Sequence, residues 1–185
     1  MEKKQQEADM KNKAGNLLSW VASSAVLIEI DQYTKALAVA RLKNQQPFVI
    51  LDGVFEFLYS ENRGAAFGLM QGRQGFFFLI GIVVLAVAGY AMLRMPGWQE
   101  KRYHWLKLCV IMITAGAVGN MIDRVSQGYV VDFLYFKLIN FPIFNVADIY
   151  VVVACILFIL LMLFYYKEEE LGQIFPFMKN KKAEE

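Results

Sequence analysis

The chain has 185 residues, of which 57% are hydrophobic, and its 19 basic and 17 acidic side chains leave a net charge of only +2. So small a net charge gives no broad basic surface, which argues against nucleic acid as a partner. The apolar residues occur in long blocks rather than in a 3.6-residue stripe. This pattern indicates a one-domain, multi-pass membrane protein and argues against a soluble domain.

Four apolar blocks follow one another along the chain, each close to the ~20 residues that a helix needs to cross a bilayer. They cover residues 17–40, 75–95, 103–121 and 146–166. Charged stretches precede the first block and follow the last one. We therefore predict a charged N-terminal tail (1–16), a four-helix membrane domain (17–166) and a charged C-terminal tail (167–185), in an all-α membrane protein with a small β element.

The basic residues predict the orientation of these helices. An even number of spans places both termini on one side of the membrane. Twelve Lys and Arg residues would then lie on the side of the termini and six on the opposite side. Basic residues concentrate on the cytoplasmic side of membrane proteins, so the termini are expected in the cytoplasm and the segments 41–74 and 122–145 outside.

The segment 47–60 is too short to span a membrane and is interrupted by Asp52 and Gly53. It is rich in β-branched and aromatic residues, which predicts two short strands around a turn. Aromatic rings are favoured at the boundary between lipid and water. We expect these strands to lie on the outer surface of the membrane.

Polar residues recur within and beside the apolar blocks. Asp31 and Lys35 are spaced to pair on one helix face. Gly116, Asn120, Asp123 and Arg124 are spaced by four, three and one, and are expected on a common side of the third helix. Such residues either join helices by hydrogen bonds or belong to a functional site, and the spacing leaves both interpretations open.

Asp132 and Asp148 lie among apolar residues, the first just beyond the third helix and the second at the start of the fourth. Alone, Asp148 is explained by a favourable interaction with the helix dipole. Two neighbouring carboxyl groups that share a proton can instead act as acid and base. Asn120 and Asn145 could supply amide donors, and this paired arrangement favours catalysis. The segment 61–68, with Asn62 and Gly64, is either an ordinary loop or a site of close ligand approach.

Other chemistries are less well supported. Cys109 and Cys155 lie in apolar blocks without CxxC spacing, His104 is a single histidine, and an HExxH motif is absent, so we expect no metal and no cofactor. A small proton-coupled transporter or channel subunit that uses Asp31, Lys35 and Asp132 as a relay is the alternative function. It predicts polar residues through the whole bilayer and internal repeats, and neither is seen.

Taken together, four motifs resemble lipoprotein signal peptidase (signal peptidase II), a family of bacterial membrane aspartyl peptidases. The motifs are Asp-Gln-Tyr-Thr-Lys at 31–35, Asn-Arg-Gly-Ala-Ala-Phe at 62–67, Gly-Asn-Met-Ile-Asp-Arg at 119–124 continuing to Val-Val-Asp-Phe at 130–133, and Phe-Asn-Val-Ala-Asp at 144–148. Each motif is weak by itself, whereas their order on four predicted helices is specific. The resemblance covers residues 17–166.

This resemblance implies a hydrolase that removes the signal peptide from diacylglyceryl-modified prolipoproteins by cleaving just before the lipidated cysteine. It implies that Asp132 and Asp148 form the catalytic pair, and that nine residues line or brace the site: Asp31, Lys35, Asn62, Gly64, Gly116, Asn120, Asp123, Arg124 and Asn145. The strands at 47–60 would form a surface β-cradle. The expected location is the bacterial cytoplasmic (inner) membrane, with membrane lipids as partners and the site at the outer leaflet. A monomer that is a target of globomycin is expected.

Overall fold

The structure, a computed structural model, describes residues 2–64 and 74–175. The small-residue run at 65–68 and the last ten residues of the expected C-terminal tail lie outside this range. The elements in chain order are α1 (Glu2–Leu42), β1 (Phe48–Leu51), β2 (Phe55–Asn62), α2 (Gln74–Arg94), η2 (Lys101–Tyr103), α3 (His104–Gln127), β3 (Val130–Phe136), η3 (Lys137–Ile139), α4 (Val146–Phe164) and α5 (Glu168–Ile174).

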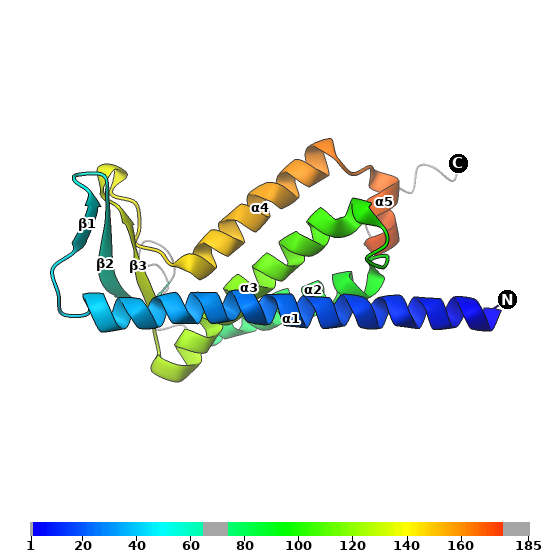
Figure 1. Cartoon of the computed structure of the whole chain (residues 1–185), viewed down its shortest axis with the longest axis horizontal. Helices are drawn as coiled ribbons and strands as arrows, with labels where there is room; N and C mark the ends of the chain where they lie inside the picture. The colour runs from blue at the N-terminus through cyan, green and yellow to red at the C-terminus, as the bar shows by residue number, and fades with distance from the viewer. Residues whose placement is uncertain (1, 65–73, 176–185) are drawn as a thin grey trace.

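The helices form an elongated bundle with the sheet at one end and α5 at the other (Figure 1). α3 is the central helix and packs against α1, α2 and α4. α1 runs along the whole bundle, and its first residues lie on the side of α5, far from the sheet (Figure 1). The turns from α1 to β1 and from α3 to β3 therefore lie at the opposite end from the start of α1.

α1 begins before the apolar block at 17–40, because residues 2–16 are helical as well. Glu, Lys, Gln and Ala dominate these residues, and all four are strong helix formers. The buried residues of α1 are Asn16, Ser24, Asp31, Lys35 and Ala38. Their spacing of eight, seven, four and three places them along one stripe that faces the bundle.

Among the described residues, three helices are long and apolar enough to cross a membrane. They cover Gly75–Arg94, Lys101–Gln127 and Val146–Phe164 and agree closely with the second, third and fourth predicted spans. Each presents most of its surface to the surroundings, as expected for helices in lipid. α1 is not among them, because polar residues such as Glu29, Asp31 and Lys35 interrupt its apolar part.

The three strands form one antiparallel sheet in the order β1-β2-β3. The predicted hairpin is confirmed, with Gly53 in its turn at φ 69°, a value that favours glycine. β3 was not predicted. It pairs with β2 so that Ser60 stands opposite Asp132 and Asn62 opposite Val130. This register joins the loop before α2 to the segment after α3.

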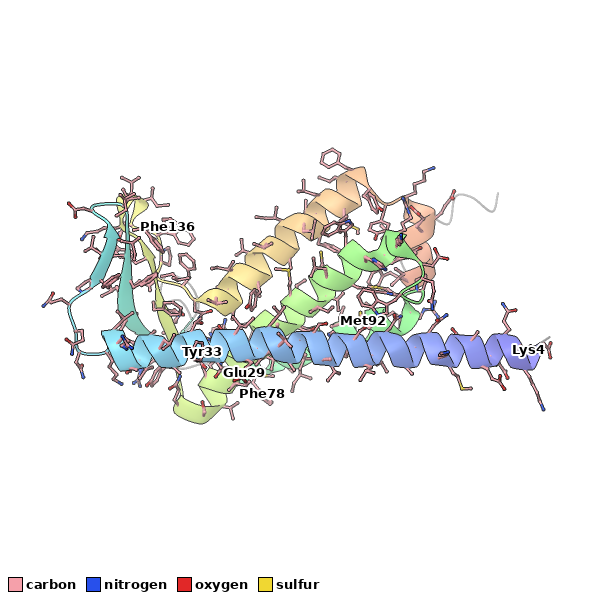
Figure 2. The ribbon with its side chains drawn as sticks, viewed as in Figure 1. Lys4, Glu29, Tyr33, Phe78, Met92 and Phe136 are labelled. Carbon is pink, nitrogen blue, oxygen red and sulfur yellow. The ribbon has the colours of Figure 1, made fainter. Side chains whose placement is uncertain are left out.

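Two apolar clusters hold the bundle together at its ends. One surrounds Met92 and Leu106 near α5, and the other surrounds Val131 and Phe133 beside the sheet. Figure 2 shows Met92 close to the α5 end and Phe136 at the sheet end. The polar residues described next lie beside the second cluster, where α1, α3, α4 and the sheet meet.

Candidate active site

Asp148 is fixed by the way in which α4 begins. The side chain of Asn145 accepts a hydrogen bond from the Asp148 backbone N–H at 3.0 Å, and Asp148 Oδ2 accepts one from the Asn145 backbone N–H at 3.1 Å. This reciprocal pair is a capping box, which satisfies two free donors at the helix N-terminus. The local sequence therefore holds the Asp148 carboxylate against the first turn of α4, where a negative charge is favoured.

Asp132 comes to the same place from β3. Its Oδ1 accepts a hydrogen bond from Asn145 Nδ2 at 2.7 Å, and its Oδ2 accepts one from Asn62 Nδ2 at 2.9 Å. The Asp132 side chain is almost fully buried. Two hydrogen bonds between Leu134 and Phe144 hold the segment before α4 against β3. Asn145 thus contacts both candidate carboxyl groups, one through its side chain and one through its backbone.

A second polar group lies behind this pair and centres on Lys35. The Lys35 ammonium pairs with Asp31 Oδ2 at 2.8 Å and with Asp123 Oδ2 at 3.1 Å, and all three side chains are at most 4% exposed. The predicted Asp31–Lys35 pair is confirmed. Asp31 Oδ1 also accepts the backbone N–H of Ala147 at 2.9 Å. α1 is thereby fastened to α3 and to the first turn of α4.

Asn120 connects the two groups. Its Oδ1 accepts hydrogen bonds from Lys35 Nζ at 2.9 Å and from Asn145 Nδ2 at 3.1 Å, while its Nδ2 donates to Asp148 Oδ1 at 2.8 Å. Among the described residues, no buried side-chain nitrogen or oxygen in this cluster lacks a partner. A network with all its members satisfied is rigid and holds its side chains in fixed positions.

Asp123 and Arg124, which the sequence predicts on a common side of the third helix, contact different partners in the structure. Neighbouring residues of a helix point about 100° apart, so these two side chains face different partners. Asp123 turns toward Lys35 and α1. Arg124 donates to the Gly64 carbonyl at 3.2 Å and to the Asn120 carbonyl at 3.3 Å, and its guanidinium stacks over the Phe77 ring. Gly64 in turn donates its N–H to Asn62.

The two glycines of α3 allow close approach of other elements. A Cβ at Gly116 would stand 2.5 Å from the Ala147 carbonyl oxygen of α4. Gly116, which was predicted near the site, therefore braces it through helix packing. Gly119 and Gln32 belong to the quoted motifs but were not predicted as site residues. Gln32 donates to Asp31, to Asp123 and to the Gly119 carbonyl. Only the position of Gly119 and Gln32 beside predicted site residues in these motifs could have indicated that they belong to the site.

The electrostatic environment of Asp132, beside Asp148, favours the protonated form of its carboxyl group. Burial raises the pKa of Asp132 to about 7, and the nearby charge of Asp148 acts in the same direction. The hydrogen bonds from Asn62 and Asn145 and the charge of Lys35 oppose the rise. A carboxyl group with such a pKa is protonated in a substantial part of the molecules at neutral pH, as a general acid requires.

Buried carboxyl groups lie where helices that are apolar enough to cross a membrane meet a small antiparallel sheet, which indicates a membrane protein with a buried polar site. The family comparison gives this class a more specific identity. The Peptidase_A8 family, described as signal peptidase (SPase) II, matches residues 23–164. The chain therefore belongs to the signal peptidase II family, and it is an aspartic-type peptidase of lipoprotein processing.

Individual relatives agree with this assignment. A lipoprotein signal peptidase of Caldanaerobacter subterraneus subsp. tengcongensis is 43% identical over 134 residues, which are 72% of this chain and 88% of the relative. One of Streptococcus thermophilus is 39% identical over 133 residues, 72% of this chain and 84% of the relative. A solved structure described as a bacterial membrane enzyme at 1.9 Å resolution matches with a TM-score of 0.68 and 29% identity, covering 80% of this chain and 94% of its own.

Proposed function

We propose that Asp132 and Asp148 are the catalytic pair of this peptidase, and that they cleave a prolipoprotein just before its diacylglyceryl-modified cysteine. The observation that carries this proposal is the difference between the two pairs of acidic residues. Asp31 and Asp123 both form an ion pair with Lys35. Within the described part of the chain, Asp132 and Asp148 accept amide donors and neither lies in an ion pair.

This difference matters for the chemistry. A carboxylate that is paired with a buried lysine is held in its ionised form and exchanges protons poorly. Two carboxyl groups without a cation between them share a proton more readily, since ionising both at once is costly in a buried place. Asn145 contacts both groups and keeps their separation fixed. Asp132 and Asp148 are therefore suited to reaction, and Asp31 and Asp123 to support.

Hydrolysis would proceed by general acid–base catalysis. The ionised carboxylate takes a proton from water while the water oxygen attacks the scissile carbonyl carbon, and the protonated carboxyl group gives its proton to the carbonyl oxygen. The tetrahedral intermediate then collapses. The carbon–nitrogen bond breaks, the leaving nitrogen takes the proton that came from water, and the second carboxyl group recovers its own from the intermediate.

The location of the site fits a lipid-modified substrate. We infer four spans, with α1 as the first, cytoplasmic termini with charged tails (1–16 and 167–185), and a monomer in the cytoplasmic membrane. The sheet would lie at the outer leaflet, and the strands of 47–60 would act as a cradle for the peptide. Exposed apolar side chains on β1, Phe48 to Leu51, support contact with membrane lipids. The substrate's acyl chains could then remain in the bilayer while the peptide reaches the polar cluster.

The test uses the purified protein and a diacylglyceryl-modified prolipoprotein, with the products followed by mass spectrometry. The wild-type protein should release the signal peptide and leave a product that begins with the lipidated cysteine. Asp132→Asn and Asp148→Asn keep the side-chain shape but cannot exchange the proton, so each should abolish cleavage. Asp9→Asn, an exposed position on α1, is the matched control. Near-normal turnover by either site variant would exclude the proposed pair.

A further inference from the structure

The orientation of two asparagine side chains determines what Asp148 encounters. An Asn side chain offers a donor at one end and an acceptor at the other, and its neighbours decide which end faces where. The Lys35 ammonium can only donate, so the Asn120 atom that contacts it at 2.9 Å must be oxygen. The opposite end of Asn120 must then be the NH₂ group, and this group faces Asp148.

Asn145 is oriented in the same sense. Its Oδ1 accepts the backbone N–H of Asp148, so its NH₂ group faces Asn120 Oδ1 and Asp132. Asn120 Oδ1 consequently receives two donors, Lys35 and Asn145, and cannot turn toward Asp148 without losing both. Asp148 accepts at both oxygens, from Asn120 and from the Asn145 backbone. Such an arrangement stabilises an ionised carboxylate. Asp132 also accepts two amide donors, but only at Asp148 is one of the donors, Asn120, oriented by Lys35.

We propose that Lys35 is a positioning residue which, through Asn120, keeps Asp148 ionised as the general base and leaves the shared proton on Asp132 as the general acid. The proposal rests on the assignment of Asp132 and Asp148 as the catalytic pair. Burial raises the pKa of Asp132 to about 7, which agrees with a proton on that group. Without Lys35, Asn120 could reverse and present its oxygen to Asp148, which favours a protonated Asp148.

Several charged groups besides Lys35 influence whether Asp132 or Asp148 holds the shared proton. The negative charge of Asp31 on α1 opposes ionisation of Asp148, whereas the positive charge of Lys35 favours it. The charge of Arg124 on α3 acts on both Asp132 and Asp148, and the charges of Asp132 and Asp148 act on each other. Asp123 acts through its ion pair with Lys35. A useful variant must therefore remove the Lys35 donor without changing the net charge of its cluster.

The double variant Lys35→Met/Asp31→Asn meets this condition. It removes one positive and one negative charge, so the cluster of Lys35, Asp31 and Asp123 keeps its net charge of −1. Asp31→Asn alone retains the Lys35 donor and is the direct comparison. Lys137→Met makes the same substitution at an exposed lysine of η3 and controls for the loss of a lysine elsewhere in the protein. The measurement is kcat/KM for the lipidated substrate as a function of pH, because its acid limb reports ionisation of the general base.

We expect the acid limb of the double variant to move up by about one pH unit, because the reversed Asn120 no longer donates the hydrogen bond that favours the ionised form of Asp148. Asp31→Asn alone should leave that limb in place or move it down, and Lys137→Met should leave it unchanged. Asn120→Leu keeps Lys35 and adds no charge but removes the NH₂ donor to Asp148, so its acid limb should also move up. This second variant tests the link if the first one folds poorly.

An acid limb that stays at the wild-type pH in either test variant, with only a lower rate, would overturn the positioning role and leave Lys35 as a structural residue. Failure of the proposed function has a different signature. Asp132→Asn or Asp148→Asn would then retain activity, whereas failure of the present inference leaves both variants inactive and only the pH profile unmoved.

Discussion

Gly119 of α3 lies so close to Asp31 of α1 that a Cβ at position 119 would stand 2.5 Å from the Asp31 Oδ2 atom. The absence of a side chain at Gly119 lets α1 and α3 approach at the level of the Lys35 ion pairs. Glycine therefore has a packing role at this position, which outweighs its unfavourable effect on a helix.

Gly119→Ala should destabilise the protein by roughly 1–3 kcal/mol, since the added methyl group must push a buried carboxylate out of its ion pair. Thermal unfolding of the purified protein in detergent measures the effect. Gly15→Ala is the control, because nothing lies within 4 Å of a Cβ at this exposed helical position. It should raise the Tm slightly, as alanine favours a helix. Equal behaviour of the two variants would show that Asp31 moves aside at little cost.

Asp123→Asn should lower stability rather than catalytic competence. Asp123 accepts hydrogen bonds from the backbone N–H of Val131 and from Gln32, and it pairs with Lys35. An amide in its place loses the ion pair with Lys35. Its NH₂ group would also face one of the groups that now donate to Asp123, which lowers the free energy of unfolding by roughly 1–3 kcal/mol. The Tm and the yield of monodisperse protein should fall, while the folded fraction still cleaves substrate. A normal Tm with complete loss of cleavage would instead give Asp123 a part in the reaction.

The sequence was sufficient where local spacing determines structure. Apolar block lengths predicted α2, α3 and α4, and the i,i+4 spacing predicted the Asp31–Lys35 pair. Local spacing misled at Asp123 and Arg124, because adjacent helix residues do not face each other. It could not reveal β3 as a strand, since β3 depends on pairing with β2, about 70 residues earlier in the chain.

The same limit applies to the candidate site. The motifs identified which residues belong together, whereas their contacts join positions that are far apart in the chain. Asn62 contacts Asp132 across 70 residues, and Asp31 accepts the N–H of Ala147 across 116. Only the fold shows that Lys35 forms ion pairs with Asp31 and Asp123 and not with Asp132 or Asp148. The proposed division between catalytic and supporting residues depends on this fact.

The raised pKa of Asp132 should make stability depend on pH. The pKa of an unfolded Asp is about 3.9, whereas that of Asp132 in the folded protein is about 7. The folded state therefore binds the proton more tightly, and this contribution to stability is fully present below pH ~4 and is lost as the pH rises through about 7. Between about pH 5 and pH 8 the wild-type Tm should fall more than that of Asp132→Asn. Parallel Tm curves for the two proteins would exclude a raised pKa at this residue.

Asn62→Ala should slow cleavage without abolishing it. Asn62 donates to Asp132 Oδ2, and a hydrogen bond of this kind contributes about 0.5–1.5 kcal/mol, with more at stake when a buried partner is left unpaired. The rate should fall by roughly three- to thirtyfold. Because this hydrogen bond lowers the pKa of Asp132, its removal should also move the alkaline limb of the rate profile to higher pH. Gln46→Ala, at an exposed amide of the same outer segment, should behave like the wild type.

The orientation in the membrane can be tested with reporter fusions at the two ends of the bundle. Fusions after Asn44 and after Lys137, both at the sheet end, should read as outside, and a fusion after Gln99, between α2 and η2, should read as inside (Figure 1). The reason is the excess of basic residues on the side of the termini. A reporter at the N-terminus tests α1 as a span in spite of its buried Asp31 and Lys35. It should read as inside, opposite to Asn44, and the same reading at both positions would mean that α1 does not cross the membrane. An inside reading at Lys137 would place Asp132 and Asp148 at the cytoplasmic leaflet, where the proposed outer-leaflet cleavage could not occur.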